Sequence, residues 1–202
     1  MKTSLLAIGA LAASVLMAVP AFAEGWTPAP PVVTDVVVGS QDAPVTVYEY
    51  ASFTCSHCAR FHTESADAFI RDYVETGKAR LVIRHLPLDR SALGAALAVA
   101  CMPEGLKLRS VGAFFRDIDA WAADLRIAPV VAGLVDGDMA ALEGIADCMA
   151  GQDLAEGIMS LAADAIENGV DGTPAFVVEG DIHVGFRTAS ELGALVDEAS
   201  GR

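Results

Sequence analysis

The sequence predicts an α/β domain whose mixed central sheet is flanked by helices and interrupted by an all-helical insertion. Two β-branched runs, at 45–50 and 79–87, enclose one helical segment, which is the pattern of a parallel strand pair. Two apolar runs on either side of "EGD" predict an antiparallel hairpin near the C-terminus. Between these β regions, from about 91 to 168, the chain is rich in Ala and Leu and has no convincing strand. Parallel and antiparallel pairs together predict a mixed sheet.

The N-terminal segment 1–23 has the features of a secretory signal peptide. One cation at Lys2 precedes an apolar run that ends at Pro20, followed by A-F-A. The alternative, a membrane anchor, needs about 20 apolar residues, and this run is shorter. We therefore expect cleavage after Ala23 and export to the periplasm.

The rest of the chain divides into a short arm and one domain. Residues 24–34 are proline-rich and predict an extended, loosely held arm. Residues 35–202 are numerous enough to bury a sizeable core as one domain. After the strand at 45–50, Thr54 offers an N-cap for a helix that Gly77 ends.

Four helical patterns make up the insertion, and one helix follows the hairpin. The last helix begins at a capping box in which Thr188 or Ser190 pairs with Glu191. The insertion helices are expected at about 91–102, 106–121, 138–150 and 153–168, with breaks at Pro103, Pro129 and glycines 133, 137 and 151.

Charge and cysteine content exclude several classes of partner and site. The formal net charge of -14 repels phosphate backbones, so nucleic acid is not an expected partner. Zinc usually needs two close ligand pairs, and only Cys55 and Cys58 form one; His57, between them, is poorly placed to complete the tetrahedron. A c-type haem needs histidine directly after the second cysteine, where the chain has Ala59. We expect neither a metal nor another cofactor.

Redox exchange explains the close cysteine pair better than a bracing disulfide does. A bridge from Cys55 to Cys58 closes a very short ring, so its entropic gain is small. Cys55 falls on the first turn of a helix, where unpaired N–H groups and the helix dipole stabilise a thiolate and lower the thiol pKa. Cys58 is expected to be more buried and to act as the resolving thiol.

The two residues between the cysteines are expected to tune them. His57 places positive charge near the Cys55 sulfur and Ser56 adds a hydroxyl donor, and both favour the thiolate. The alternative is that His57 is an exposed loop residue without this role. The other histidines have no catalytic spacing and are expected to be ordinary surface or partly buried residues. They are His62, His85 and His183.

Three stretches of the sequence are similar to one known family. "EYASFTCSHCARFH" is similar to a strand, CxxC pair and helix start, "GVDGTPAFVV" to a cis-proline loop, and the block from 91 to 168 to an inserted helical domain. From about Asp35 to its C-terminus, the chain resembles the DsbA-like branch of the thioredoxin superfamily. The resemblance implies a thioredoxin fold in which Cys55 is the nucleophile and Cys58 resolves the mixed disulfide.

The same resemblance assigns three further residues. Pro174 would be the cis-proline, preceded by Thr173, beside the cysteines and offering backbone groups to an extended substrate strand. An ordinary trans proline is the alternative. Glu49 matches the acid beneath the active site, able to accept the proton of Cys58. The alternative interpretation of Glu49 is a partly solvated carboxylate at the end of a strand, without a catalytic role.

The remaining cysteines have a different expected role. Cys101 ends one insertion helix and Cys148 lies near the end of another, so a bridge would staple the helical block. Closing a loop of this length contributes about 4 kcal/mol on the loop-entropy model. We expect a structural disulfide, with two buried free thiols as the alternative.

These observations predict an exported thiol:disulfide oxidoreductase that introduces disulfides into unfolded or newly secreted proteins. The resemblance implies a membrane partner of the DsbB type, and we expect a monomer. The chain has Ser56 where many strongly oxidising relatives have proline, and Thr173 also occurs in isomerase-like relatives. A periplasmic reductase or isomerase is therefore one alternative, and a metal-binding or chaperone module is another.

Overall fold

The computed structural model describes residues 26–201. The expected signal peptide, 1–23, and the first residues of the arm lie outside this range. Within residues 26–201, no helix has the length and apolar character needed to span a bilayer.

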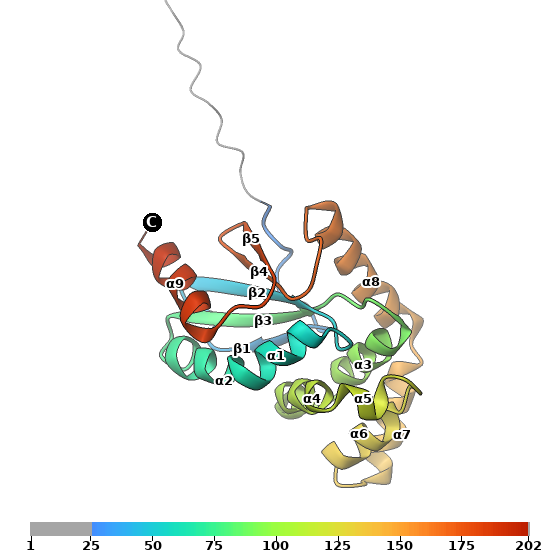
Figure 1. Cartoon of the computed structure of the whole chain (residues 1–202). Helices are drawn as coiled ribbons and strands as arrows, with labels where there is room; N and C mark the ends of the chain where they lie inside the picture. The colour runs from blue at the N-terminus through green and yellow to red at the C-terminus, as the bar shows by residue number, and fades with distance from the viewer. Residues whose placement is uncertain (1–25, 202) are drawn as a thin grey trace, which may run out of the picture.

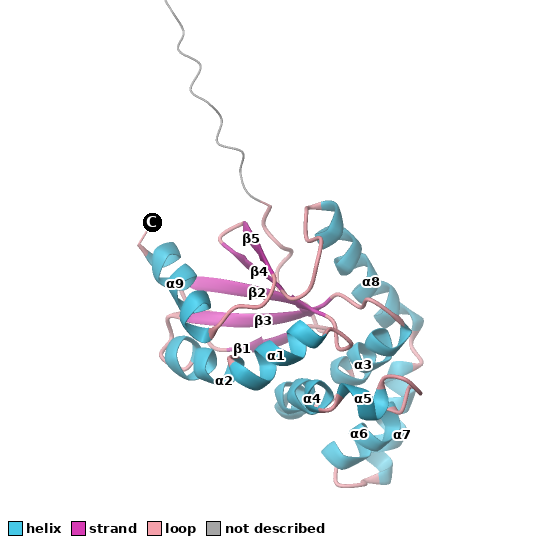
Figure 2. Ribbon diagram, viewed as in Figure 1, coloured by secondary structure: helices cyan, strands magenta, loops and turns pink. Residues whose placement is uncertain are grey.

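In the described part of the chain, a mixed sheet of five strands, in the order β1-β3-β2-β4-β5, forms the centre (Figure 2). Strands β2 and β3 are parallel, whereas β1 pairs with β3, β4 with β2, and β5 with β4 in antiparallel fashion. The predicted α/β class, mixed sheet and helical insertion are confirmed. The strands are β1 (Val36–Val38), β2 (Val45–Ala51), β3 (Ala79–His85), β4 (Ala175–Val178) and β5 (Asp181–Val184).

Alternating side chains give the sheet two buried faces, because successive residues of a strand point to opposite sides. Residues such as Val47 and Leu81 pack in the larger core with helices α1 (Ser56–Glu64) and α9 (Ala189–Ser200). Tyr50 and its neighbours on the other face pack against α8 (Gln152–Glu167). Figure 1 shows α1 and α9 together on one side of the sheet. Helices on both faces explain why its central strands are apolar almost throughout.

The helix expected from Thr54 to Gly77 is divided into three pieces. After α1, the chain bends at Ser65 and continues as α2 (Ala66–Phe69) and a π-helical segment, η1 (Ile70–Val74). Phe69 and Val74 are buried. The apolar residues that predicted one helix therefore still face the core, although the segment changes from α-helix to π-helix.

The helical insertion lies beyond the ends of β2 and β3 (Figure 1). The segment expected as one helix at 106–121 is two helices, because the backbone of Asp117, with φ -145° and ψ 70°, is not helical. Helix α6 is absent from the prediction because proline usually interrupts a helix. Pro129 lies in the first turn of α6, where its missing N–H costs nothing. The insertion contains α3 (Arg90–Ala100), α4 (Glu104–Arg116), α5 (Ile118–Trp121), α6 (Ile127–Leu134), α7 (Met139–Met149) and α8.

Local signals at the C-terminal end agree with the structure. Glu179 and Gly180 both have positive φ angles, 49° and 88°, as a two-residue hairpin turn requires. Thr188, rather than Ser190, is the N-cap of α9 and forms the reciprocal capping box with Glu191.

The described part of the N-terminal arm is held against the sheet. The ring of Trp26 lies 5.8 Å from that of Tyr50. Arg84 donates to the Pro30 carbonyl at 3.2 Å and to Asp35 Oδ2 at 2.7 Å. Arg84 and Asp35 are both buried, so their charges are compensated by this pairing.

Candidate active site

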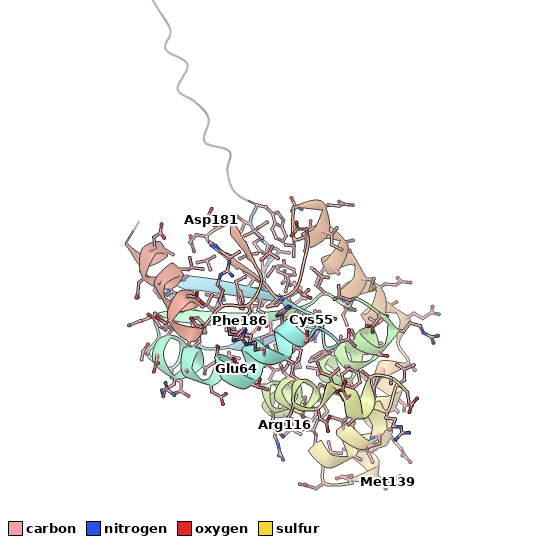
Figure 3. The ribbon with its side chains drawn as sticks, in the orientation of Figure 1. Cys55, Glu64, Arg116, Met139, Asp181 and Phe186 are labelled. Carbon is pink, nitrogen blue, oxygen red and sulfur yellow. A yellow bond between two sulfur atoms is a disulfide. The ribbon has the colours of Figure 1, made fainter. Side chains whose placement is uncertain are left out.

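Cys55 and Cys58 lie at the junction between β2 and α1 (Figure 3). Cys55, not Thr54, is the N-cap of α1, and its Sγ atom accepts a hydrogen bond from the Cys58 N–H at 3.4 Å. Thr54 instead donates to Asp89 Oδ2 at 2.7 Å, which ties the loop before the pair to the start of α3. The nucleophilic sulfur therefore occupies the place of the oxygen that usually caps a helix.

The environment of Cys55 favours its thiolate. The pKa of Cys55 is lowered to about 5, first by a hydrogen bond from the Cys58 thiol, despite the opposing effect of burial. Hydrogen bonds from the backbone N–H groups of Cys58 and His57 lower it further. These donors are the unpaired groups that every helix N-terminus presents.

Cys58 has the opposite properties. Its side chain is completely buried, and burial is the largest cause that raises its pKa. The hydrogen bond with Cys55 and the negative charge of Glu49 raise it further. One thiol is therefore ionised and accessible while its neighbour keeps its proton, as an attacking and a resolving thiol require.

The Thr173–Pro174 segment lies against the nucleophile. The peptide bond between these residues is cis. The Cys55 thiol donates to the Thr173 carbonyl oxygen at 3.2 Å, and Gly185 N–H donates to the Pro174 carbonyl at 2.7 Å. Thr173 Oγ1 is buried and has no hydrogen-bond partner in the described part of the chain. Residues separated by more than 100 positions thus meet at the redox pair.

Glu49 lies in the middle of β2 and is completely buried, so it is not a solvated carboxylate at a strand end. Both of its carboxylate oxygens are 3.0 Å from Nε2 of His62. His62 had no predicted catalytic role, although its position four residues after Cys58 places the two side chains on one helix face. A buried acid on the adjoining strand was the missing signal.

Ser56 and His57 are exposed on the first turn of α1. The lowered pKa of Cys55 involves the backbone N–H of His57 and not its imidazole. The structure therefore brings together five of the sequence-based candidates, whereas the side chains of these two point into solvent. The five are Cys55, Cys58, Thr173, Pro174 and Glu49.

The other predicted cysteine pair lies in the insertion. A disulfide joins Cys101, the C-cap of α3, to Cys148 in α7. His85, expected at or near the surface, is instead buried at the end of β3 beside the ring of Phe53, 5.4 Å away. Among residues 26–201 there is no cluster of three or more side chains that could bind a metal ion.

Comparisons with known proteins agree with this site. A family model described as thioredoxin matches residues 32–198. A relative from Rickettsia felis, named "Putative protein-disulfide oxidoreductase", is 25% identical over 171 residues, which are 82% of this chain and 60% of that protein. The chain spans only 24–26% of other curated relatives that it matches.

Two solved structures show the same architecture. α-DsbA1 of Wolbachia pipientis is 26% identical, with a TM-score of 0.73 over 85% of this chain and 93% of that one. BdbD of Bacillus subtilis is 15% identical, with a TM-score of 0.74 over 89% of this chain and 100% of that one, a likeness of fold. The chain therefore belongs to the thioredoxin family and has the DsbA-like form of its fold.

Proposed function

We propose that the protein is an exported thiol:disulfide oxidoreductase that passes the Cys55–Cys58 disulfide to newly secreted, cysteine-containing proteins in the periplasm. The observation that carries the proposal is the lowered pKa of Cys55 at the N-cap of α1. A sulfur that is stable as a thiolate is a good leaving group, so the disulfide containing it is readily attacked by a substrate thiolate.

The asymmetry of the two thiols supports an oxidising direction. Hydrogen bonds to the Cys55 thiolate stabilise the reduced form of the pair, and a stabilised reduced form makes the disulfide a stronger oxidant. Thioredoxin, which reduces proteins, has a potential of about -270 mV, and strong oxidants of this kind approach about -120 mV. We expect a potential well above that of thioredoxin.

The surface beside Cys55 suits an extended substrate segment. Thr173 and Pro174 offer backbone groups next to the sulfur, and the loop containing Phe186 is held to Pro174 by the Gly185 hydrogen bond. The guanidinium group of Arg60 lies 4.1 Å from the centre of the Phe186 ring. Backbone pairing with Thr173 would align a substrate cysteine with little demand on sequence.

Repeated turnover requires a second partner. Each donated disulfide leaves Cys55 and Cys58 reduced, so an oxidant must restore the bond. A membrane oxidase of the DsbB type would supply it in the periplasm, which the features of segment 1–23 favour.

The test is stoichiometric oxidation of a reduced, unfolded protein by the purified oxidised chain. We expect one substrate disulfide for each Cys55–Cys58 disulfide consumed, and a reduction potential above about -200 mV in equilibrium with glutathione. Cys55→Ser is the inactive control. A potential near that of thioredoxin would indicate a reductase, and no exchange at all would eliminate the oxidoreductase.

A further inference from the structure

His62 and Glu49 form a buried pair directly beneath the redox cysteines. The His62 side chain is 4% exposed and that of Glu49 is 0% exposed. Nε2 lies 3.0 Å from each carboxylate oxygen, so a single N–H donates between the two. A hydrogen bond to a charged group in a buried site is stronger than one between neutral groups, so this contact fixes the carboxylate.

Aromatic rings hold the His62 imidazole in this orientation. It stacks on Phe115 of α4, with ring centres 4.5 Å apart and an angle of 12° between the planes. Phe61 packs edge-on against the His62 imidazole, with ring centres 5.2 Å apart and an angle of 83° between the planes. A ring held on two sides cannot swing away from Glu49 without breaking core contacts.

Apolar residues flank the His62–Glu49 pair within the sheet. In the sheet, Glu49 lies between Ile83 on β3 and Phe176 on β4. Phe115 is the neighbour from α4. On β3, Arg84 follows Ile83 but points to the opposite face of the sheet, where it pairs with Asp35. His85 lies on the same face as Ile83, and burial lowers its pKa to about 4 and leaves it neutral near pH 7. On α1, the charge of Glu49 acts directly on the Cys58 thiol.

The exchange reaction requires a proton at Cys58. When a substrate thiolate attacks Cys55 Sγ, the Cys55–Cys58 bond breaks and its electron pair remains on Cys58, which becomes a thiolate in a buried site. A second substrate thiolate then attacks the substrate sulfur of the mixed disulfide, and Cys55 leaves as a thiolate. The enzyme gains two electrons, and Cys58 must take up one proton, because a buried, unpaired thiolate is unstable.

We propose that His62 is a positioning residue that holds the Glu49 carboxylate beneath Cys58 and shares with it the proton that Cys58 takes up. His62 is one helical turn beyond Cys58, so the pair lies on the buried side of the same helix. After the transfer, the pair is one proton poorer and regains that proton from solvent. The inference rests on the proposed exchange activity and assigns the proton step of that site.

The test measures how fast 2-mercaptoethanol opens the oxidised pair, by acid quench and mass spectrometry, across pH 5–10. The rate is divided by the thiolate fraction of the reagent, so the remaining pH dependence reports proton supply to Cys58. In the unsubstituted protein, we expect this normalised rate to fall with rising pH, as the His62–Glu49 pair loses its proton.

His62→Phe keeps the stacking but removes the donor and the base. We expect at least a threefold lower normalised rate at pH 7 and a descending limb moved to lower pH, because the pair has lost one of its two proton-binding groups. His62→Gln can hold Glu49 but cannot carry a proton. Its normalised rate should be higher than that of His62→Phe, but its descending limb should stay at the lower pH. His183→Phe, on β5, is the matched control and should leave the profile unchanged.

A second comparison separates a proton role from packing. In a Glu49→Gln background, His62→Phe should change the normalised rate by less than twofold, because the two residues act as a unit. The proposal is overturned if the His62→Phe profile superimposes on that of the unsubstituted protein after scaling, or if the effect is equally large without Glu49. Failure to oxidise proteins would count against the proposed function alone, because a small thiol opens the disulfide in either case.

Discussion

The Sγ atom of Cys55 lies 3.2 Å from the carbonyl oxygen of Thr173, although 118 positions separate these residues in the chain. The contact joins the start of α1 to the segment that enters β4, and the helical insertion lies between them in sequence. The insertion therefore extends the domain without disturbing the strand order that assembles the redox site.

Replacing the resolving thiol should trap the first intermediate. In Cys58→Ala, a substrate that has been joined to Cys55 cannot be released by attack from within the protein. We expect mixed disulfides that appear on non-reducing gels of periplasmic extracts and disappear on reduction. Cys55→Ala is the control and should trap nothing. Equal trapping by both variants would contradict the assignment of Cys55 as the nucleophile.

Removing the Cys101–Cys148 disulfide should lower stability without stopping exchange. The double variant Cys101→Ala/Cys148→Ala loses a cross-link across 47 positions, and we expect a loss of about 2–4 kcal/mol in urea unfolding. The exchange rate should stay within twofold, because the bond joins α3 to α7 and neither carries the redox pair. Unchanged stability would show that the bridge does not staple the insertion.

A methyl group at Gly193 should destabilise the packing of α9. A Cβ atom there would overlap the ring of Tyr73, which also donates a hydrogen bond to Asp197 at 3.0 Å. We expect Gly193→Ala to cost about 1–3 kcal/mol. Gly157→Ala on α8 meets no atom within 4 Å and is the control, expected to stabilise by about 0.4–1 kcal/mol. Denaturant midpoints of the two variants that move in the same direction would refute this packing argument.

His85 should make stability depend on pH. Its burial lowers the pKa to about 4, whereas an unfolded histidine has about 6.5. Between these values the unfolded chain binds more protons, so this contribution is complete above about pH 6.5 and is lost as the pH falls to about 4. The total is about 3 kcal/mol.

The measurement is the free energy of unfolding of His85→Phe and the unsubstituted protein at pH 7 and pH 4.5. Between pH 7 and pH 4.5, the unsubstituted protein should lose more than about 1 kcal/mol of unfolding free energy relative to His85→Phe. The reason is that part of the roughly 3 kcal/mol contributed by His85 is lost at the lower pH. His57→Gln, at an exposed position, should not show this change. A constant difference for His85→Phe would mean that its imidazole is not buried in neutral form.

Local sequence patterns predicted the sheet, the capping of α9 and the position of the redox pair well. The β-branched runs around Val47 and Leu81 pack on both faces, so their apolar pattern could only fit a central strand. Thr188 and Glu191 form the capping box at the spacing that the sequence shows. These features depend on neighbours within a few residues, which a single sequence contains.

Long-range contacts explain what the sequence could not predict. The role of His62 depends on Glu49 of another element, and the burial of His85 depends on the aromatic residues packed around it. The predicted break at Pro129 is wrong because the identity of the residue alone does not show whether a proline interrupts a helix or lies in its first turn. The errors at His62 and His85 thus concern neighbours from distant parts of the chain, whereas the error at Pro129 is local.

The most direct test of the central claim is the ionisation of the Cys55 thiol in the reduced protein, measured from the rate of alkylation by iodoacetamide as a function of pH. Cys58 is buried and should react far more slowly. The account requires a midpoint near pH 5, which matches the lowered pKa of Cys55 at the helix N-cap. A midpoint near 8.5, that of an ordinary cysteine, would contradict it.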